Sequence, residues 1–114
     1  MREEVSWLVE LVIKPGQLDN FRALTGEMVD SIRRETGVLS YERFVSEDGK
    51  FVYAYERYAD PAAALAHLRT FEKMFSRRFI GMVDRRRFTV FGAPTDELRK
   101  VLDRFGATYL RLFD

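Results

Sequence analysis

Apolar and polar residues alternate over several stretches of this chain, which is the pattern of a β-strand. Residues Val5–Ile13 are apolar at every second position on one face, and their other face is half apolar as well. Residues 38–46 and Phe51–Tyr58 flank the pair Asp48-Gly49, which favours the tight turn of a β-hairpin. A strand that is apolar on both faces needs cover on both faces. We therefore expect helices on one side of the first strand and other cover, such as a second subunit, on its far side.

Other stretches carry apolar residues at three- and four-residue steps, the period of an amphipathic helix. The first stretch covers residues 17–36 and stops before Gly37, a residue type that suits the left-handed end of a helix. A second helix should begin at Asp60-Pro61, because Asp can accept a hydrogen bond from a first-turn amide and Pro is tolerated at the first helical position. This helix is predicted for residues 60–69, with a separately capped helical segment over residues 70–82.

The last part of the chain adds further elements of both kinds. Residues 83–92 are predicted as a fourth strand, Pro94 opens a helix that closes at Gly106, and residues 107–113 form one more short strand. The apolar residues of this tail are too numerous for a free, solvated segment. We expect the tail to pack on the edge of its own domain or to reach across a dimer.

The order of elements defines the fold class. Strand–helix–strand–strand–helix–strand is the ferredoxin-like split βαβ arrangement. We predict an α+β protein with a four-stranded antiparallel sheet over residues 1–92 and a C-terminal helix and strand, residues 93–114, as an extension of the same domain. Helices on one face leave the other face as a large apolar patch. Pairing of two such faces in a symmetric homodimer would cover it.

Composition limits the functions that the chain can serve. It has 114 residues and no cysteine, which excludes disulfides, thiolate metal sites and a cysteine nucleophile. Its 19 basic and 18 acidic residues give no strong field for nucleic acid or an anionic membrane. The first residues are acidic where a signal peptide would be basic, and no apolar run is long enough for a membrane span. We predict a cytoplasmic protein without nucleic-acid or membrane partners.

The single histidine, His67, is the main candidate for chemistry. An unperturbed imidazole titrates near neutrality, so His67 could act as a general base or donate a hydrogen bond to a substrate oxygen. It could equally be a half-buried helix residue that contacts a carboxylate. One histidine without cysteine argues against a catalytic zinc or haem site within one subunit. We predict no metal and no cofactor.

Aromatic residues around the expected position of this helix could bind a flat substrate. Tyr41, Tyr53, Tyr55 and Tyr58 can pack against such a molecule and donate hydrogen bonds, although each could also be a core or interface ring. Trp7 could form a wall of the pocket or pack in the dimer interface. These alternatives stay open on the sequence alone.

Charged residues offer further candidates. Glu56 lies on an otherwise apolar strand face and could orient His67 or balance an arginine. Arg78 could meet an anionic group of a substrate, although a solvated or interface ion pair is the commoner use. In the run Arg85-Arg86-Arg87, strand alternation predicts that the middle residue faces away from the other two. This division weakens any nucleic-acid-binding patch.

Several short segments together resemble the antibiotic biosynthesis monooxygenase (ABM) domain family of the dimeric α/β-barrel superfamily. The segments are Lys14-Pro15-Gly16, Phe21, Glu35-Thr36-Gly37-Val38-Leu39-Ser40-Tyr41, Tyr55-Glu56-Arg57-Tyr58 and Ala64-Leu65-Ala66-His67-Leu68. The most specific feature is Glu56-x-Tyr58 followed by His67 nine residues later. The resemblance covers about residues 5–92. This chain differs from many members at Tyr58, where they have Trp, at Ala54, where anthrone-oxidising members have Asn, and at Glu72, where many have a second His.

The resemblance implies two subunits that pack their sheets face to face, with a pocket in each between sheet and helices. Some family members oxidise anthrones or quinols with molecular oxygen and no cofactor. We predict a cofactor-independent monooxygenase-like enzyme acting on a small phenolic, quinol or polyketide-type compound; the alternatives are a non-catalytic small-molecule-binding or stress-response dimer, or a small-molecule isomerase. The predicted catalytic residues are His67 and Tyr58, and the predicted substrate-binding residues are Trp7, Tyr41, Tyr53, Tyr55, Glu56 and Arg78.

Overall fold

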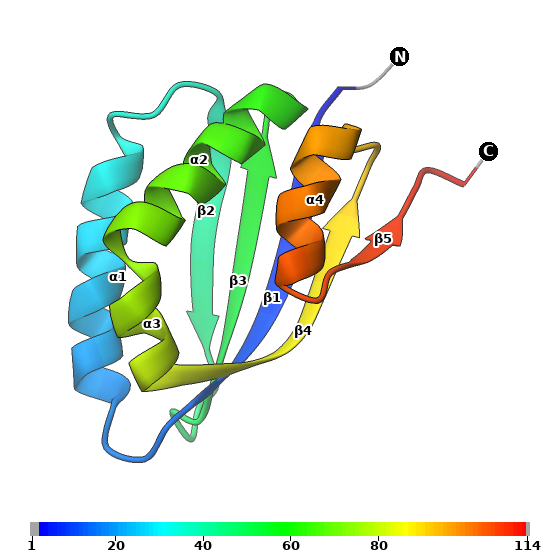
Figure 1. The fold of residues 1–114 in the computed structure, drawn as a ribbon. Helices are drawn as coiled ribbons and strands as arrows, with labels where there is room; N and C mark the ends of the chain where they lie inside the picture. The colour runs from blue at the N-terminus through cyan, green and yellow to red at the C-terminus, as the bar shows by residue number, and fades with distance from the viewer. Residues whose placement is uncertain (1–2, 114) are drawn as a thin grey trace.

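One mixed sheet of five strands organises the computed structural model, which describes residues 3–113 (Figure 1). The strands are β1 (Val5–Ile13), β2 (Val38–Val45), β3 (Phe51–Tyr58), β4 (Val83–Phe91) and β5 (Thr108–Leu110), in the spatial order β2-β3-β1-β4-β5. Strand β1 is central and antiparallel to both β3 and β4, and β2 is antiparallel to β3. The predicted α+β class and split βαβ order are confirmed.

The predicted four-stranded sheet was one strand short, because β5 joins the sheet. It pairs in parallel with β4, and the amide of Gly92 donates a hydrogen bond of 2.9 Å to the carbonyl of Leu110. A parallel neighbour requires a crossover connection, and α4 (Asp96–Arg104) supplies it. The C-terminal segment therefore packs on the edge of its own domain.

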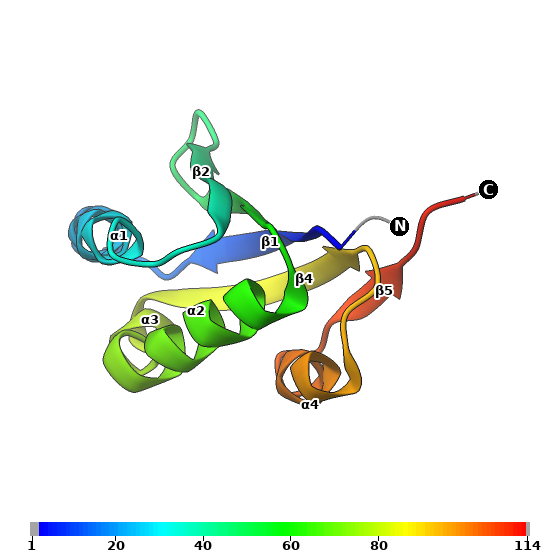
Figure 2. The ribbon, with the colours of Figure 1, turned by 90° about the horizontal axis from the view of Figure 1, so that it is seen from above.

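The other helices are α1 (Leu18–Ile32), α2 (Pro61–Met74) and α3 (Ser76–Met82). Figure 2 shows that the helices of the described chain lie on one side of the curved sheet. The Asp60 carboxylate caps α2 by accepting a hydrogen bond of 2.8 Å from the amide of Ala63. The predicted break near residue 70 was wrong: α2 continues to Met74 and the chain bends at Phe75. Burial of Leu68 and Phe71 on one face of α2 keeps the helix continuous across this position.

The core lies between the helices and the inner face of the sheet. Trp7 and Leu11 of β1 are 1% and 2% exposed, and Ala54 and Tyr58 of β3 are buried on the same face. Position 37 must be glycine for a local reason: its φ is +83°, and an added Cβ would lie 2.7 Å from the Cβ of Ala63. This close approach brings the start of β2 against the first turn of α2.

The outer face of the sheet is not covered by any helix within residues 3–113. Phe44 of β2 pairs with Tyr53 of β3 on this face, and the two residues are 56% and 38% exposed. Exposed aromatic side chains on a bare sheet are consistent with the homodimer prediction, which remains a prediction. No helix in the described part of the chain has the length and apolar character needed to cross a membrane.

Candidate functional site

A pocket opens between the inner sheet face and the helices. Its cavity volume is about 50 Å³, within a depression of about 520 Å³ that includes the opening to solvent, and most of its lining is apolar. The polar side chains that reach this pocket are Trp7, Tyr41, Arg43, Glu56, His67 and Arg85. An apolar cavity with a few convergent polar groups is the usual form of a small-molecule site.

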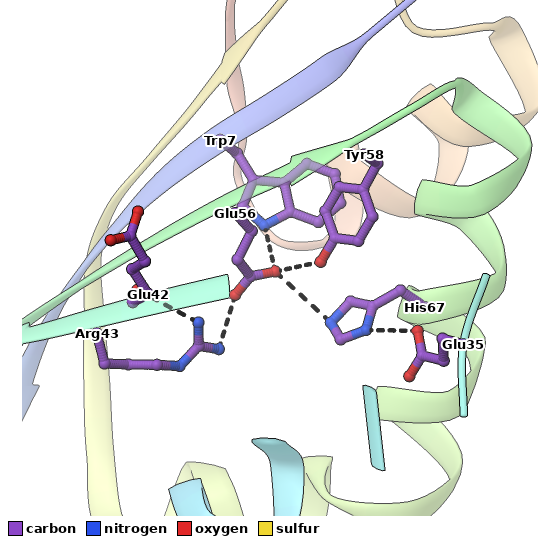
Figure 3. A network of polar contacts seen from close by, with 7 residues as sticks. All are labelled: Trp7, Glu35, Glu42, Arg43, Glu56, Tyr58 and His67. Carbon is purple, nitrogen blue, oxygen red and sulfur yellow. Dashed lines mark hydrogen bonds and ion pairs between the residues drawn. The ribbon is translucent and has the colours of Figure 1, made fainter. Parts of the chain in front are cut away.

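The carboxylate of Glu56 lies at the centre of a cluster of polar side chains, the Glu56 cluster (Figure 3). Its Oε1 accepts hydrogen bonds from Trp7 Nε1 at 2.9 Å and from the Tyr58 hydroxyl at 2.5 Å. Its Oε2 accepts a hydrogen bond of 2.8 Å from an Arg43 Nη atom, and Glu56 is only 5% exposed. The carboxylate is therefore held rigidly by three donors from three different strands.

Neighbouring charges determine the ionisation of this cluster. Burial alone would raise the pKa of Glu56, but the Arg43 guanidinium and His67 outweigh it and hold the pKa below its usual value. Burial and the adjacent Glu56 carboxylate raise the pKa of Tyr58 well above its usual value. Glu56 is thus a fixed negative charge at neutral pH, and Tyr58 is a protonated donor rather than a base.

His67 lies between two carboxylates and is 6% exposed. Its Nδ1 is hydrogen-bonded to Oε1 of Glu35 at 3.0 Å, and its Nε2 lies 3.5 Å from Oε1 of Glu56. The ring also packs between Tyr41 and Tyr58, with ring centroids 5.4 and 5.3 Å away. A carboxylate that accepts a hydrogen bond from one ring nitrogen orients an imidazole and fixes its tautomer. The arrangement suits proton transfer.

The hydroxyl of Tyr41 is buried and has no hydrogen-bond partner among residues 3–113. Its ring lies 3.6 Å from the Arg43 guanidinium carbon, a close cation–π contact. Burial, reinforced by the charge of Glu56, raises the pKa of Tyr41, so the hydroxyl keeps its proton. Buried polar groups in proteins nearly always have a partner. A ligand in the pocket could therefore accept a hydrogen bond from this hydroxyl.

Strand pairing explains how these residues meet. In the sheet register Trp7 of β1 and Tyr41 of β2 both pair with Glu56 of β3, so the three side chains project from one level of the inner face. Tyr58 follows two residues later on the same face. The capped start of α2 then carries His67 over this level, under two turns from Pro61.

Sequence comparison identifies the family. The sequence model of the antibiotic biosynthesis monooxygenase (ABM) family matches residues 5–73, which is more than half of the chain. The chain belongs to the antibiotic biosynthesis monooxygenase family. The ABM match includes the whole Glu56 cluster with His67 and Glu35, whereas Arg85 and the residues of α4 lie beyond it. No curated protein matches the chain in a sequence search.

Solved structures share the ABM fold. MupZ from Pseudomonas fluorescens is 22% identical and superposes with a TM-score of 0.88, covering 100% of this chain and 88% of its own. Rv0793 from Mycobacterium tuberculosis is 28% identical with a TM-score of 0.66, covering 82% of this chain and 96% of its own. SnoaB from Streptomyces nogalater, a cofactor-independent oxygenase, is 14% identical with a TM-score of 0.68, covering 82% of this chain and 95% of its own.

Five of the predicted site residues of this ABM protein lie together at the polar end of the pocket. They are Trp7, Tyr41, Glu56, Tyr58 and His67. The fold brings these residues together, and their roles as site residues remain predictions. The interpretation of His67 as a residue that contacts a carboxylate and the interpretation as a pocket residue both describe what is found.

Three predicted substrate-binding residues lie elsewhere. Tyr53 and Tyr55 point to the outer face of the sheet, because they alternate with Ala54 and Glu56, which face the helices. The expectation that these tyrosines line the pocket was therefore wrong. Arg78 lies on the exposed side of α3, where it forms an ion pair of 2.9 Å with Glu27.

The arginine run of β4 also differs from the alternation that we expected. The pairing with β1 shifts between Glu10 and Leu11, which places one extra residue in β4. As a result Arg86 lies over the ring of Phe51 on the outer face, and Arg87 lies 3.7 Å from Glu10 on that same face. Arg85, which pairs with Leu11, instead reaches the pocket.

Sequence reasoning missed three residues of the site: Glu35, Arg43 and Arg85. Arg43 lies two residues after Tyr41 in the same strand, so the strand period could have identified it. No local signal identifies Glu35, which reaches His67 from the turn after α1, or Arg85, which depends on the bulge. Within residues 3–113, no group of three His, Asp or Glu side chains is placed to hold a metal ion.

Proposed function

We propose that this protein is a cofactor-independent, monooxygenase-like enzyme that oxidises a small phenolic, quinol or polyketide-type compound with molecular oxygen. The observation that carries the proposal is the position of His67, held between Glu35 and Glu56 at the polar end of an apolar pocket. Membership of the ABM family supports the reaction class. The description of SnoaB as a cofactor-independent oxygenase supports chemistry without a bound group.

His67 is the proposed base. It removes a proton from a phenol or from an acidic C–H group of the substrate, and the two flanking carboxylates stabilise the imidazolium that forms. The electron-rich substrate anion then reduces O₂ and forms a C–O bond, and the resulting peroxide takes the proton back from the His67 imidazolium to give a hydroperoxide. Loss of water leaves a carbonyl, so a CH₂ group and O₂ become C=O and H₂O. The apolar walls exclude bulk water from the reactive intermediate.

The other residues position these groups. The free hydroxyl of Tyr41 would donate a hydrogen bond to the substrate oxygen on which negative charge develops. Tyr58 and Trp7 hold the Glu56 carboxylate in place through their hydrogen bonds, so we assign them positioning roles. Substrate binding would rest mainly on the apolar lining and on stacking against the rings.

A homodimer is part of the proposal. The outer face of the sheet carries exposed aromatic groups, among them Phe44 and Tyr53, and packing of two such faces would bury them. Light scattering should give about twice the chain mass of 13.4 kDa. A monomer at micromolar concentration would exclude the face-to-face assembly.

Oxygen consumption by chelator-treated protein tests the reaction. A panel of quinols and anthrones should include at least one compound that consumes one O₂ per carbonyl formed. His67→Gln should slow this turnover about a hundredfold or more, because general bases contribute at least that factor. Arg78→Gln, which changes an exposed ion pair on α3, is the matched control and should keep the wild-type rate. Absence of O₂ uptake across the panel would contradict the proposal.

A non-catalytic binding protein is the second candidate, and one observation favours it. Both carboxylate oxygens of Glu56 already accept hydrogen bonds from protein donors, and a buried network of this kind also serves as a rigid structural core. Saturable binding of panel compounds without O₂ uptake by the wild type would support this candidate over the enzyme.

A further inference from the structure

Arg85 is a cation at the pocket that has no carboxylate partner among the described residues. It projects from β4 on the inner face and helps to line the pocket, although much of its side chain is exposed. The other arginine of the lining, Arg43, is paired with Glu56 at 2.8 Å. On the outer face Arg87 lies near Glu10, and the neighbouring Asp84 lies 4.0 Å from Lys14.

Aromatic stacking holds Arg85 in position. Its guanidinium carbon lies 4.8 Å from the ring centroid of Phe105, at the end of α4. The Phe105 ring is in turn stacked on Phe88 of β4, with an interplanar angle of 8° and a centroid separation of 6.1 Å. A guanidinium that lies against an aromatic ring keeps its N–H edge free for a planar, bidentate acceptor. Partial burial lowers the pKa of Arg85, a cost that a bound anion would offset.

The distance between Arg85 and the Glu56 cluster limits the shape of a ligand that reaches both. Arg85 pairs with Leu11 of β1, whereas Glu56 pairs with Trp7 of the same strand. Four residues of β-strand rise correspond to roughly 13 Å between these levels. On β1 and β4 the lining between them is apolar, with Val9 and Phe88 at the intermediate level, and the Arg43 guanidinium at that level is already paired with Glu56.

We propose that Arg85 binds the carboxylate of an elongated, mainly apolar acid whose other end reaches His67 and Tyr41. The inference rests on the proposed function only in placing the reacting end at His67. A carboxylate suits the site because its single charge matches one guanidinium, whereas a phosphate monoester carries up to about two charges at neutral pH. Arg85 and Phe105 lie outside the residues that match the family model, so this specificity would belong to the part of the chain beyond that match.

Calorimetric titration with a matched ligand pair tests this assignment. The probes are 6-phenylhexanoate and its uncharged amide, 6-phenylhexanamide, which have the same length. Wild-type protein should bind the acid at least tenfold more tightly than the amide. Arg85→Gln should abolish this preference and leave the affinity for the amide unchanged, and Arg85→Lys should retain part of it. Fluorescence of Trp7, the single tryptophan, should respond to both probes because this ring lines the pocket.

Arg86→Gln is the matched control. It removes the same charge from the adjacent position, but Arg86 lies over Phe51 on the outer face, so the preference for the acid should persist. The assignment would be overturned if the wild type bound acid and amide equally, or if neither probe showed saturable binding. It would also be overturned if the preference for the acid survived in Arg85→Gln or was lost equally in Arg86→Gln. The titration involves no turnover, so failure of the oxygen assay leaves its result intact.

Discussion

The buried pair of Glu56 and Arg43 provides the sharpest test of the site's energetics. Their side chains are 7% and 13% exposed, and the hydrogen bond between them is 2.8 Å long. In Glu56→Gln the amide oxygen can still accept a hydrogen bond from Trp7 or Tyr58, but the negative charge is lost. The Arg43 guanidinium is then buried without a counter-charge, and breaking a buried ion pair in this way costs about 3–5 kcal/mol.

Urea denaturation at fixed protein concentration and pH 7 measures this loss. With a slope of about 2 kcal/mol per molar urea, the midpoint should fall by roughly 1.5–2.5 M. The double variant Glu56→Gln/Arg43→Met removes both charges and should recover part of the loss, because replacing a buried pair by apolar groups is often close to neutral. A fixed concentration is needed because a dimer's stability depends on it.

A surface pair supplies the control. Glu72 and Arg104 form an ion pair of 2.9 Å, but their side chains are 35% and 59% exposed. Glu72→Gln should therefore change the free energy of unfolding by no more than about 1 kcal/mol. If Glu56→Gln lowers stability no more than Glu72→Gln does, or if the double variant is as unstable as the sum of the single ones, the buried charge does not act as described.

Three further predictions follow from the described contacts. The pKa of Glu56 is depressed in the folded state, so the contribution of its ionised carboxylate to folding stability is fully present above the ordinary pKa of 4.5 and is lost as the pH falls through the folded pKa. The difference in unfolding free energy between the wild type and Glu56→Gln should therefore shrink in acid. A difference that does not change with pH would contradict this. Tyr41→Phe removes a buried hydroxyl that has no hydrogen-bond partner, so thermal stability should not fall. The affinity for a bound ligand should drop up to about tenfold. A destabilised variant would show that the hydroxyl does have a hydrogen-bond partner in the free protein. Deletion from Thr95 onward removes Leu98 and Leu102, both fully buried, and should lower the melting temperature by roughly 10 °C or more; an unchanged value would show that α4 contributes little.

Much of the local structure follows from the sequence alone. The two-residue period of β1 and β3 and the Asp60-Pro61 helix start are local signals, because they depend on side-chain alternation and on capping within a few residues. They were sufficient to place Glu56 and Tyr58 on one strand face and to bring His67 near them. Pairing of β1 and β2 with β3 then brings Trp7 and Tyr41 to the same level, so five of the eight predicted site residues lie together.

The tertiary structure decided which face of each strand became the inside. Tyr53 and Tyr55 are as aromatic as Tyr58. Alternation places them on the strand face opposite to Tyr58, but it does not show which of the two faces the helices cover. The contact between Glu35 and His67 joins positions 32 residues apart, and no local pattern encodes it.

The arginine run shows the same division between local and long-range causes. Alternation predicts opposite faces for successive residues, but the bulge opposite Glu10 and Leu11 resets the phase and sends Arg85 alone into the pocket. A bulge arises from the pairing of two strands more than 70 residues apart in the chain. Backbone preferences and hydrophobic periods act over a few residues, whereas strand register is decided by packing across the whole sheet. The sequence pattern therefore determined the helices and strands, and only the folded structure determined which side chains meet.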